Sequence, residues 1–443
     1  MRFVALTAAS LALGLTMVTE ATQGTAWTTA WAASAHGPYP SGNPSAQPNL
    51  TMAIPAPAEG ARDQSMRMIV KPDVWGPSAR IRLSNAFGTR PITFDHVFVG
   101  LQLAGAAIVP GTNQRATFSG ASRVIVPAGT AVWSDAIPLA FVDPARPTST
   151  AGRKLAVSFQ VVGASGPMTW HAKALATSYL GRPGTGNHSS NDEDAAFPFS
   201  TTSWFFVDAV DMRMPAGTKV IVAFGDSITD GTGSTLNGDD RWPDVLSRRL
   251  HRAYGDRVSV VNAGIGGNRI AGPATYSPAS PVPGGPSAAA RLERDVLSLS
   301  GVAAVIWLEG INDLSRNANT SVETIAAAMK DVVSRLKAAI PGVRVIGGTV
   351  ITALGSTNGA HGSPEQDVAR RELNTFIRTS GLFDGIADFD AATLDPATGG
   401  LKPEFVPDST TGGPGDRLHP NRAGYLAMGE AIDLTLFGIR ERP

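Results

Sequence analysis

The sequence of 443 residues contains no cysteine. This absence excludes disulfides, thiolate metal ligands and a cysteine nucleophile, although many exported proteins fold without disulfides. Charged residues make up only 17% of the chain, and 37 basic and 37 acidic residues cancel to a formal net charge of zero. Because there is neither a positive net charge nor a long basic run, the composition gives no support to nucleic acid or an anionic membrane as a partner.

Long apolar runs are missing beyond the N-terminus. Met1 and Arg2 are followed by an apolar stretch, residues 3–18, which ends at the polar Thr19 and Glu20. This stretch is too short for an ordinary membrane-spanning helix and is typical of a signal-peptide core. We therefore predict a signal peptide over residues 1–24. The mature protein is expected to be secreted, periplasmic or extracellular, with no stable membrane insertion after signal removal.

Glycine and proline, by contrast, are abundant, with 48 and 32 residues. Between residues 50 and 215 such turn residues separate short runs with strand character, at 80–83, 97–99, 124–126, 131–133 and 155–159. Evenly spaced short strands divided by turns favour antiparallel sheets packed as a sandwich. The polar, glycine-rich segment 181–194 is expected to be an exposed loop.

From about residue 218 the pattern changes to apolar strands that alternate with amphipathic helices. Strands are predicted at 220–224, 258–262, 302–308, 343–351 and 385–389, and helices at 242–250, 288–299, 322–339, 365–379 and 421–436. This alternation is typical of a parallel sheet covered on both faces. The predicted organisation is a β-rich domain over residues 25–215 and an α/β domain over residues 216–443.

Reactive groups in such sheets lie just after the carboxyl ends of the strands. Three strands are followed by polar or glycine-rich segments, and a fourth such segment lies near the C-terminus. They read Gly-Asp-Ser-Ile-Thr-Asp at 225–230, Asn-Ala-Gly-Ile-Gly-Gly-Asn at 262–268, Glu-Gly-Ile-Asn-Asp at 309–313 and Asp-Arg-Leu-His-Pro at 416–420.

The chemistry of these segments favours a serine nucleophile. A serine hydroxyl is a weak nucleophile at neutral pH and needs a base beside it. Of the seven histidines, only His419 has a carboxylate three residues before it. Asp416 can therefore bind the Nδ1–H of His419 and leave Nε2 facing Ser227. His361, in a glycine-rich loop, is a weaker candidate for the lining of the site.

The four segments, in this order, resemble the motif blocks of the GDSL/SGNH hydrolases, and the match runs from about residue 218 to 438. The resemblance implies a flavodoxin-like, three-layer α/β/α domain with a parallel sheet, preceded here by the β-rich, sandwich-like domain. It implies a serine carboxylester hydrolase with Ser227, Asp416 and His419 as catalytic residues. No metal and no organic cofactor is expected.

The resemblance also implies an oxyanion hole made by the backbone N–H of Ser227, the backbone N–H of Gly266 and the side-chain amide of Asn312. Such donors stabilise the negative charge that develops on the ester oxygen. Asp226 and Asp313 lie beside these residues. They are expected to support the site or to cap the following helix.

Further segments resemble a bacterial two-domain subset of this superfamily, which is similar to arylesterases and acylhydrolases linked with xylan breakdown. These segments are 27–34, 80–88 and 241–243. The sequence contains no long apolar lid helix of the kind that would indicate long-chain lipids. The expected substrate is therefore a small acyl ester or an acylated saccharide, with a short acyl group such as acetyl.

Other enzyme classes fit less well. The segment that begins at Gly264 starts like a dinucleotide fingerprint, but Arg269 stands where the third glycine should be, and no phosphate loop is present. The chain also lacks the G-x-S-x-G of α/β-hydrolases and the H-E-x-x-H of metallohydrolases.

Two alternatives remain open. The protein could be a polysaccharide-binding protein with an impaired hydrolase domain, in which Trp75, Trp133, Trp170 and Trp204 stack on sugar rings. It could also be an acyltransferase that uses the same catalytic residues. The four tryptophans are equally consistent with core or interface positions.

Overall fold

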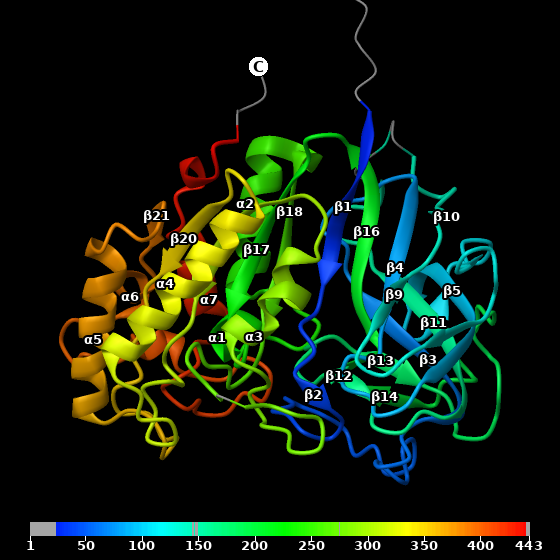
Figure 1. Cartoon of the computed structure of the whole chain (residues 1–443), viewed down its shortest axis with the longest axis horizontal. Coiled ribbons are helices and arrows are strands. Elements are labelled where there is room, and N and C mark those ends of the chain that lie inside the picture. The colour runs from blue at the N-terminus through cyan, green and yellow to red at the C-terminus, as the bar shows by residue number, and fades with distance from the viewer. Residues whose placement is uncertain (1–23, 144–145, 147–148, 274, 440–443) are drawn as a thin grey trace, which may run out of the picture.

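The computed structural model describes residues 24–143, 146, 149–273 and 275–439. Apart from Gly24, the predicted signal peptide lies outside the described residues. Two bodies lie side by side, a β-rich one and an α/β one (Figure 1). Each has a large hydrophobic cluster of its own. Within the described residues, no helix combines the length and the apolarity needed to cross a membrane.

The β-rich domain consists of short antiparallel strands in three sheets. Their orders are β1-β16-β4-β10 with β9 on β4, β14-β13-β3-β11-β5-β6 with β7 and β8 on β5, and β15-β12-β2. The strands are β1 Thr25–Ala32, β2 Gly37–Pro38, β3 Arg62–Val70, β4 Ser78–Ser84, β5 Ile92–Ala104, β6 Ala107–Ile108, β7 Gln114–Arg115, β8 Val124–Val126, β9 Ala131–Trp133, β10 Ile137–Pro138, β11 Leu155–Ala164, β12 Thr169–His171, β13 Ser178–Leu180, β14 Phe199–Thr201, β15 Trp204–Phe205 and β16 Val207–Pro215. The predicted strands and the loop at 181–194 are confirmed.

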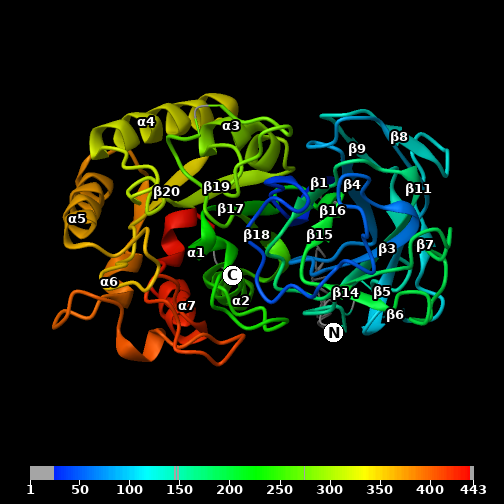
Figure 2. The same ribbon diagram turned by 90° about the horizontal axis from the view of Figure 1, so that it is seen from below.

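The α/β domain contains a parallel sheet in the order β18-β17-β19-β20-β21. Its elements are β17 Lys219–Gly225, α1 Ser227–Asp230, α2 Trp242–Tyr254, β18 Val258–Gly264, α3 Ala288–Leu292, β19 Val302–Leu308, α4 Val322–Ala339, β20 Arg344–Gly348, α5 Pro364–Thr379, β21 Gly385–Ala387, α6 Phe389–Thr393 and α7 Arg422–Glu430. Helices α3 and α4 cover one face of the sheet, and α2 and α7 cover the other (Figure 2). In chain order the strands run 2-1-3-4-5, which is the flavodoxin-like order, so the predicted fold class is confirmed.

Several predicted elements in this domain differ from the structure, beginning with the strand predicted at 343–351, which ends at Gly348. The predicted helix 288–299 is α3 followed by a π-helical turn, Glu293–Leu297. The strand predicted at 385–389 ends at Ala387, because Asp388 caps α6 by accepting the N–H of Ala391. The last helix stops at Glu430, and the Asp433 side chain caps a separate 3-10 turn, Leu434–Phe437.

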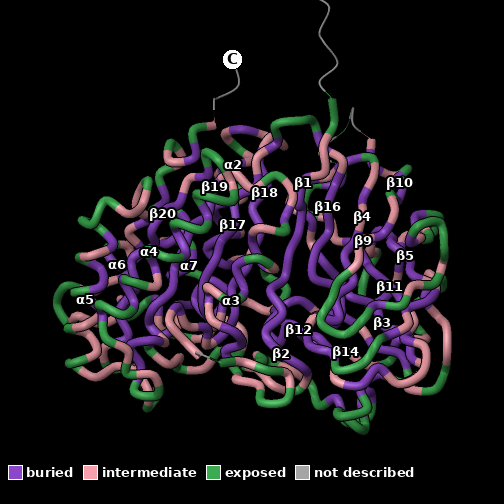
Figure 3. The backbone as a smooth tube through the Cα atoms, in the orientation of Figure 1, coloured by how far each residue is buried: buried purple, intermediate pink, exposed green. Residues whose placement is uncertain are grey.

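The two domains are joined along β1, which lies next to the α/β domain. The Thr29 N–H donates to the Ser300 carbonyl at 3.0 Å. Asp73 of the β-rich domain binds the Ser247 hydroxyl at 2.5 Å, His251 Nε2 at 3.1 Å and the Val260 N–H at 2.6 Å. In Figure 3 the buried backbone segments of β17 and β18 lie beside those of β1 and β16. The junction between the domains is therefore a packed, hydrogen-bonded interface rather than a linker.

The tryptophans proposed for sugar stacking are packing residues. Trp170 and Trp204 are buried in the core of the β-rich domain, and Trp75 packs against the same cluster. Trp133 lies beneath the guanidinium of Arg80, 4.4 Å from its ring centre, at the domain interface. The core and interface reading of these residues is confirmed.

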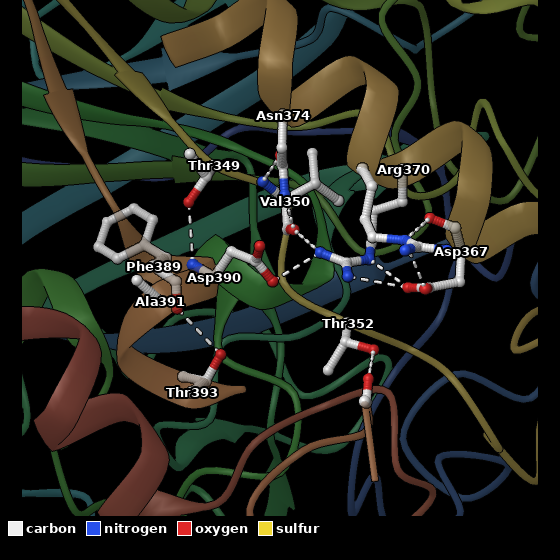
Figure 4. Close-up of polar contacts among 12 residues, drawn as sticks. Thr349, Val350, Thr352, Asp367, Arg370, Asn374, Phe389, Asp390, Ala391 and Thr393 are labelled. Atoms are coloured by element: carbon white, nitrogen blue, oxygen red, sulfur yellow. Dashed lines mark hydrogen bonds and ion pairs between the residues drawn. The ribbon is translucent and has the colours of Figure 1, made fainter. Parts of the chain in front are cut away.

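A buried arginine fixes the outer part of the parallel sheet. Arg370 on α5 binds Asp390 of α6 at 2.5 Å, Asp367 at 2.8 Å and the carbonyl of Val350 at 2.9 Å (Figure 4). A guanidinium carries five donors in a planar fork, so one side chain can hold three segments at once. The network connects α5 and α6 to the chain that leaves β20.

Candidate active site

Ser227 lies at the first turn after β17, where the sheet order reverses between β17 and β19. The Asp226 side chain caps α1 by accepting the Ile228 N–H at 2.9 Å. Burial raises the pKa of Asp226 well above its ordinary value, and the nearby Glu309 and Asp313 carboxylates add to this shift. The expected supporting role of Asp226 is thus a helix cap beneath the serine.

His419 connects Ser227 to Asp416. Its Nε2 lies 2.8 Å from the Ser227 hydroxyl oxygen, and its Nδ1 lies 2.6 Å from Asp416 Oδ2. Burial raises the pKa of Asp416, but hydrogen bonds and the charge interaction with His419 outweigh burial and hold the pKa below its ordinary range. The three side chains predicted from the sequence therefore form one chain of hydrogen bonds.

The turn from Asp416 to His419 is fixed at both of its ends. Asp416 Oδ1 accepts the N–H of Leu418 at 2.9 Å and the N–H of His419 at 2.8 Å. Its backbone carbonyl accepts the Thr357 N–H at 3.0 Å. Between them, Arg417 has a φ of 58°, in the left-handed region that non-glycine residues seldom adopt. The surrounding hydrogen bonds stabilise this unfavourable backbone conformation.

The expectation for the Gly266 N–H is corrected. That N–H donates to Asp230 Oδ2 at 3.0 Å, because the buried carboxylate lies directly behind the loop. Gly267 is the residue that follows Gly266. Its N–H and the N–H of Ser227 have no acceptor within the described part of the chain. Gly267 has a φ of 85°, which glycine adopts at little cost. The Asn312 amide donates one hydrogen to the Asn268 carbonyl at 3.0 Å, and its second hydrogen remains for a ligand.

These groups line a cleft of about 400 Å³. Gly266, Gly267 and Asn312 all contribute to its wall, together with Ser227 and His419. His361, the weaker candidate, also lines the cleft. Burial, and to a smaller extent the charge interaction with His419, lowers the pKa of His361 to about 4. A volume of this size is typical of a small-molecule site.

Comparison with known proteins assigns this half of the chain. Residues 223–427 match the model of the GDSL-like Lipase/Acylhydrolase family. These residues form a GDSL-like lipase/acylhydrolase domain, and the protein is a serine ester hydrolase. No curated protein matches the chain.

Several solved structures resemble the GDSL-like domain. A carbohydrate acetylesterase from Sinorhizobium meliloti is 16% identical and has a TM-score of 0.36, and the match covers 48% of this chain and 95% of that one. A lipase/acylhydrolase from Enterococcus faecalis is 22% identical with a TM-score of 0.36, and the match covers 50% of this chain and 96% of that one. The M. smegmatis aryl esterase is 18% identical with a TM-score of 0.34, and the match covers 48% of this chain and 95% of that one.

Asp313 supports the GDSL-like site by holding the loop that follows Gly267. Its two carboxylate oxygens accept the N–H of Ile270 at 2.9 Å and the N–H of Ala271 at 2.8 Å. Burial raises the pKa of Asp313 to about 6, although both hydrogen bonds oppose this effect. It does not cap a helix, so its supporting role takes a form that the sequence did not specify.

Arg291 joins the ends of two strands beneath the site. Its guanidinium donates to the carbonyls of Gly225 at 2.8 Å and Ala263 at 2.7 Å, and to Asn268 Oδ1 at 2.7 Å. The Arg291 side chain is fully buried. The residue therefore sets the spacing between the turn that carries Ser227 and the loop that carries Gly267.

Sequence reasoning missed three residues that the β-rich domain brings to the site. Lys173 and Asn43 line the cleft, and His171 lies 3.1 Å from Asp230 Oδ1 as a buried ion pair. Burial lowers the pKa of His171, but Asp230 outweighs burial and raises it overall. No local motif marks these residues, since their proximity to the cleft arises only from the packing of the two domains.

Proposed function

We propose that the protein is an exported esterase that removes short acyl groups, with acetyl as the preferred group, through an acyl-enzyme intermediate. The observation that carries the proposal is the hydrogen-bond chain from Ser227 through His419 to Asp416. We also propose that residues 25–215 and 216–443 are the two domains and that residues 1–24 are the export signal.

The proposed reaction has two halves. The Ser227 oxygen attacks the ester carbonyl and gives its proton to His419 Nε2, which then delivers that proton to the leaving alcohol. His419 next takes a proton from water, and the resulting hydroxide attacks the acyl-enzyme. The departing Ser227 oxygen recovers the proton, and the acid product is released. Asp416 keeps the imidazole in the tautomer that accepts a proton at Nε2.

The oxyanion of both steps needs preorganised donors. We assign the N–H of Ser227, the N–H of Gly267 and the Asn312 side-chain amide, because each faces the cleft or lacks another acceptor. One such donor typically stabilises the transition state by about 3 to 4 kcal/mol. Gly266 keeps a structural role, since its N–H binds Asp230 and its carbonyl accepts from Asn43 at 3.1 Å.

The lining of the cleft supports a short acyl group and a polar alcohol. Many of its side chains are amides or hydroxyls, while a long apolar channel would be needed to shelter a fatty acyl chain. These neutral polar residues are Asn43, Asn312, Ser315, Asn317 and Asn358. We therefore place a small acyl ester or an acylated saccharide in the cleft.

Hydrolysis of para-nitrophenyl esters, from acetyl to palmitoyl, tests this proposal. Wild type is expected to prefer the shortest chains, and Ser227→Ala is expected to lose activity by about a thousandfold or more. Ser190→Ala, at an exposed serine of the β-rich domain, is the matched control and should keep the full rate. Full activity of Ser227→Ala would contradict the proposed mechanism, and a preference for palmitoyl would contradict the proposed substrate class.

A further inference from the structure

A lysine from the β-rich domain reaches the active-site cleft. Lys173 follows β12, is only 5% exposed and lines the cleft with Ser227. Its ammonium donates to the Thr232 hydroxyl, and it forms no ion pair with any described residue. An ammonium has three hydrogens to donate, so this contact leaves donors without a protein partner.

Lys173 lies directly against the glycine loop. A Cβ atom added at Gly266 would come within 3.3 Å of Lys173 Nζ and within 3.6 Å of the Asn43 Cβ. Burial lowers the pKa of Lys173, while the carboxylates of Asp230, Asp416 and Asp226 oppose this effect. The lysine is thus held near the nucleophile by close packing and by the field of carboxylates that it does not touch.

A second cation lines the same cleft. Arg269 follows the glycine loop, is partly exposed, and forms neither an ion pair nor a side-chain hydrogen bond within the described residues. Its charge lowers the pKa of His361 and of Asp313 only through space.

The described residues that line the cleft include no carboxylate that could contact these two cations. Lys173 and Arg269 are its only lysine or arginine, and among the described lining residues there is no aspartate or glutamate. Two of the nearby carboxylates make their close contacts elsewhere: Asp230 binds His171, and Asp416 binds His419. A buried cation that no carboxylate contacts directly is costly, unless a bound group supplies a negative charge at contact distance.

We propose that the ester cleaved by this protein carries a carboxylate, as in an O-acylated sugar acid, and that Lys173 and Arg269 bind this carboxylate. The amide and hydroxyl lining would hydrogen-bond to the substrate hydroxyls, and the two cations would bind its acid group. The inference rests on the proposed esterase function. It gives the β-rich domain a role in specificity, since Lys173 belongs to that domain.

The test compares two substrates of the same shape, the O-acetylated methyl glycosides of glucuronic acid and of glucuronamide. Wild type is expected to show a kcat/KM at least about tenfold higher for the acid at low ionic strength, and this preference should narrow as salt is added. Equal rates on the two substrates, or a preference for the amide, would overturn the proposal.

Variants assign the preference to its residues. Lys173→Met is expected to bring the ratio of kcat/KM for the acid to kcat/KM for the amide down to about one, and Lys173→Arg is expected to keep most of the acid preference. A merely structural role of Lys173 would lower kcat/KM for both substrates together. Arg269→Gln, at a partly exposed site, should reduce the ratio even if Lys173→Met fails to fold. A ratio unchanged in Arg269→Gln and in a folded Lys173→Met would refute the assignment.

Para-nitrophenyl acetate separates this inference from the proposed function. It is a neutral ester, and its hydrolysis depends on Ser227 whether or not a carboxylate is recognised. Loss of the acid preference with intact, Ser227-dependent hydrolysis would sink only the further inference. A lack of Ser227 dependence would sink the esterase mechanism itself.

Discussion

Replacing Asp416 with asparagine changes one atom of the site and should reverse a tautomer. In the wild type, Asp416 Oδ1 accepts two backbone N–H groups and Oδ2 binds His419 Nδ1 at 2.6 Å. In Asp416→Asn the amide oxygen must stay on the two N–H donors, so the NH2 group faces Nδ1. Nδ1 must then accept, and the imidazole proton moves to Nε2. His419 can no longer take the proton of Ser227.

The size of the effect follows from this geometry. The shape and volume of the side chain are retained, so the loss should be confined to the transition state. Loss of the base in this way typically lowers kcat by about 10³ to 10⁴, equivalent to roughly 4 to 5.5 kcal/mol. KM should change little, because Asp416 is not among the residues that line the cleft.

The assay is hydrolysis of para-nitrophenyl acetate under steady-state conditions, with thermal unfolding as the control for folding. We expect a midpoint within a few degrees of wild type, since the turn keeps its two backbone hydrogen bonds. A folded Asp416→Asn enzyme with a kcat within tenfold of wild type would refute the argument that Asp416 fixes the tautomer of His419.

Two further predictions concern stability. Arg370→Met should lower the unfolding free energy in urea by about 3 kcal/mol, because it leaves the buried Asp390 with only the longer ion pair to Arg378 at 3.3 Å. Arg371→Met, at the exposed neighbouring arginine, should change the unfolding free energy by less than about 1 kcal/mol, and equal effects of the two substitutions would contradict the role of the network. Burial raises the pKa of Glu309 from 4.5 to about 7, so the folded state binds the Glu309 proton more tightly than the unfolded state does. The unfolding free energy should therefore fall as pH rises from 4.5 to about 7, by up to roughly 3 kcal/mol. Urea unfolding at several pH values should show that the unfolding free energy depends less steeply on pH in Glu309→Gln than in wild type. The same pH dependence in both proteins would contradict the assignment of this effect to Glu309.

The sequence predicted the α/β domain well because its signals are local. Each strand is a short apolar run, and each motif follows directly after the strand that positions it, as Ser227 follows β17. The spacing of Asp416 and His419 sufficed to predict their hydrogen bond. Element ends were less predictable, since side chains such as Asp388 and Asp433 cap new turns inside segments that still look strand-like or helical.

The direction of individual backbone groups could not be predicted from the same pattern. Gly266 and Gly267 are adjacent glycines in one loop, and only the position of Asp230 determines which N–H is taken. Lys173 could not be predicted for a different reason. It is distant from every hydrolase motif in the sequence and comes to the cleft through the packing of β12 and the following loop against the GDSL-like domain.

The pairing of β1 has a consequence for the order in which the chain can fold during synthesis. Thr25 of β1 pairs with Pro215 of β16, and Thr29 is bonded to Ser300. Strand β1 therefore has no partner strand until residues 207–215 have been made, and its α/β side stays uncovered until β18 and the chain up to residue 300 have followed. Contacts of such long sequence separation form slowly. Until residue 215 has been made, the nascent chain consequently presents an unpaired strand, which is the part of the molecule that would need protection from association with other chains.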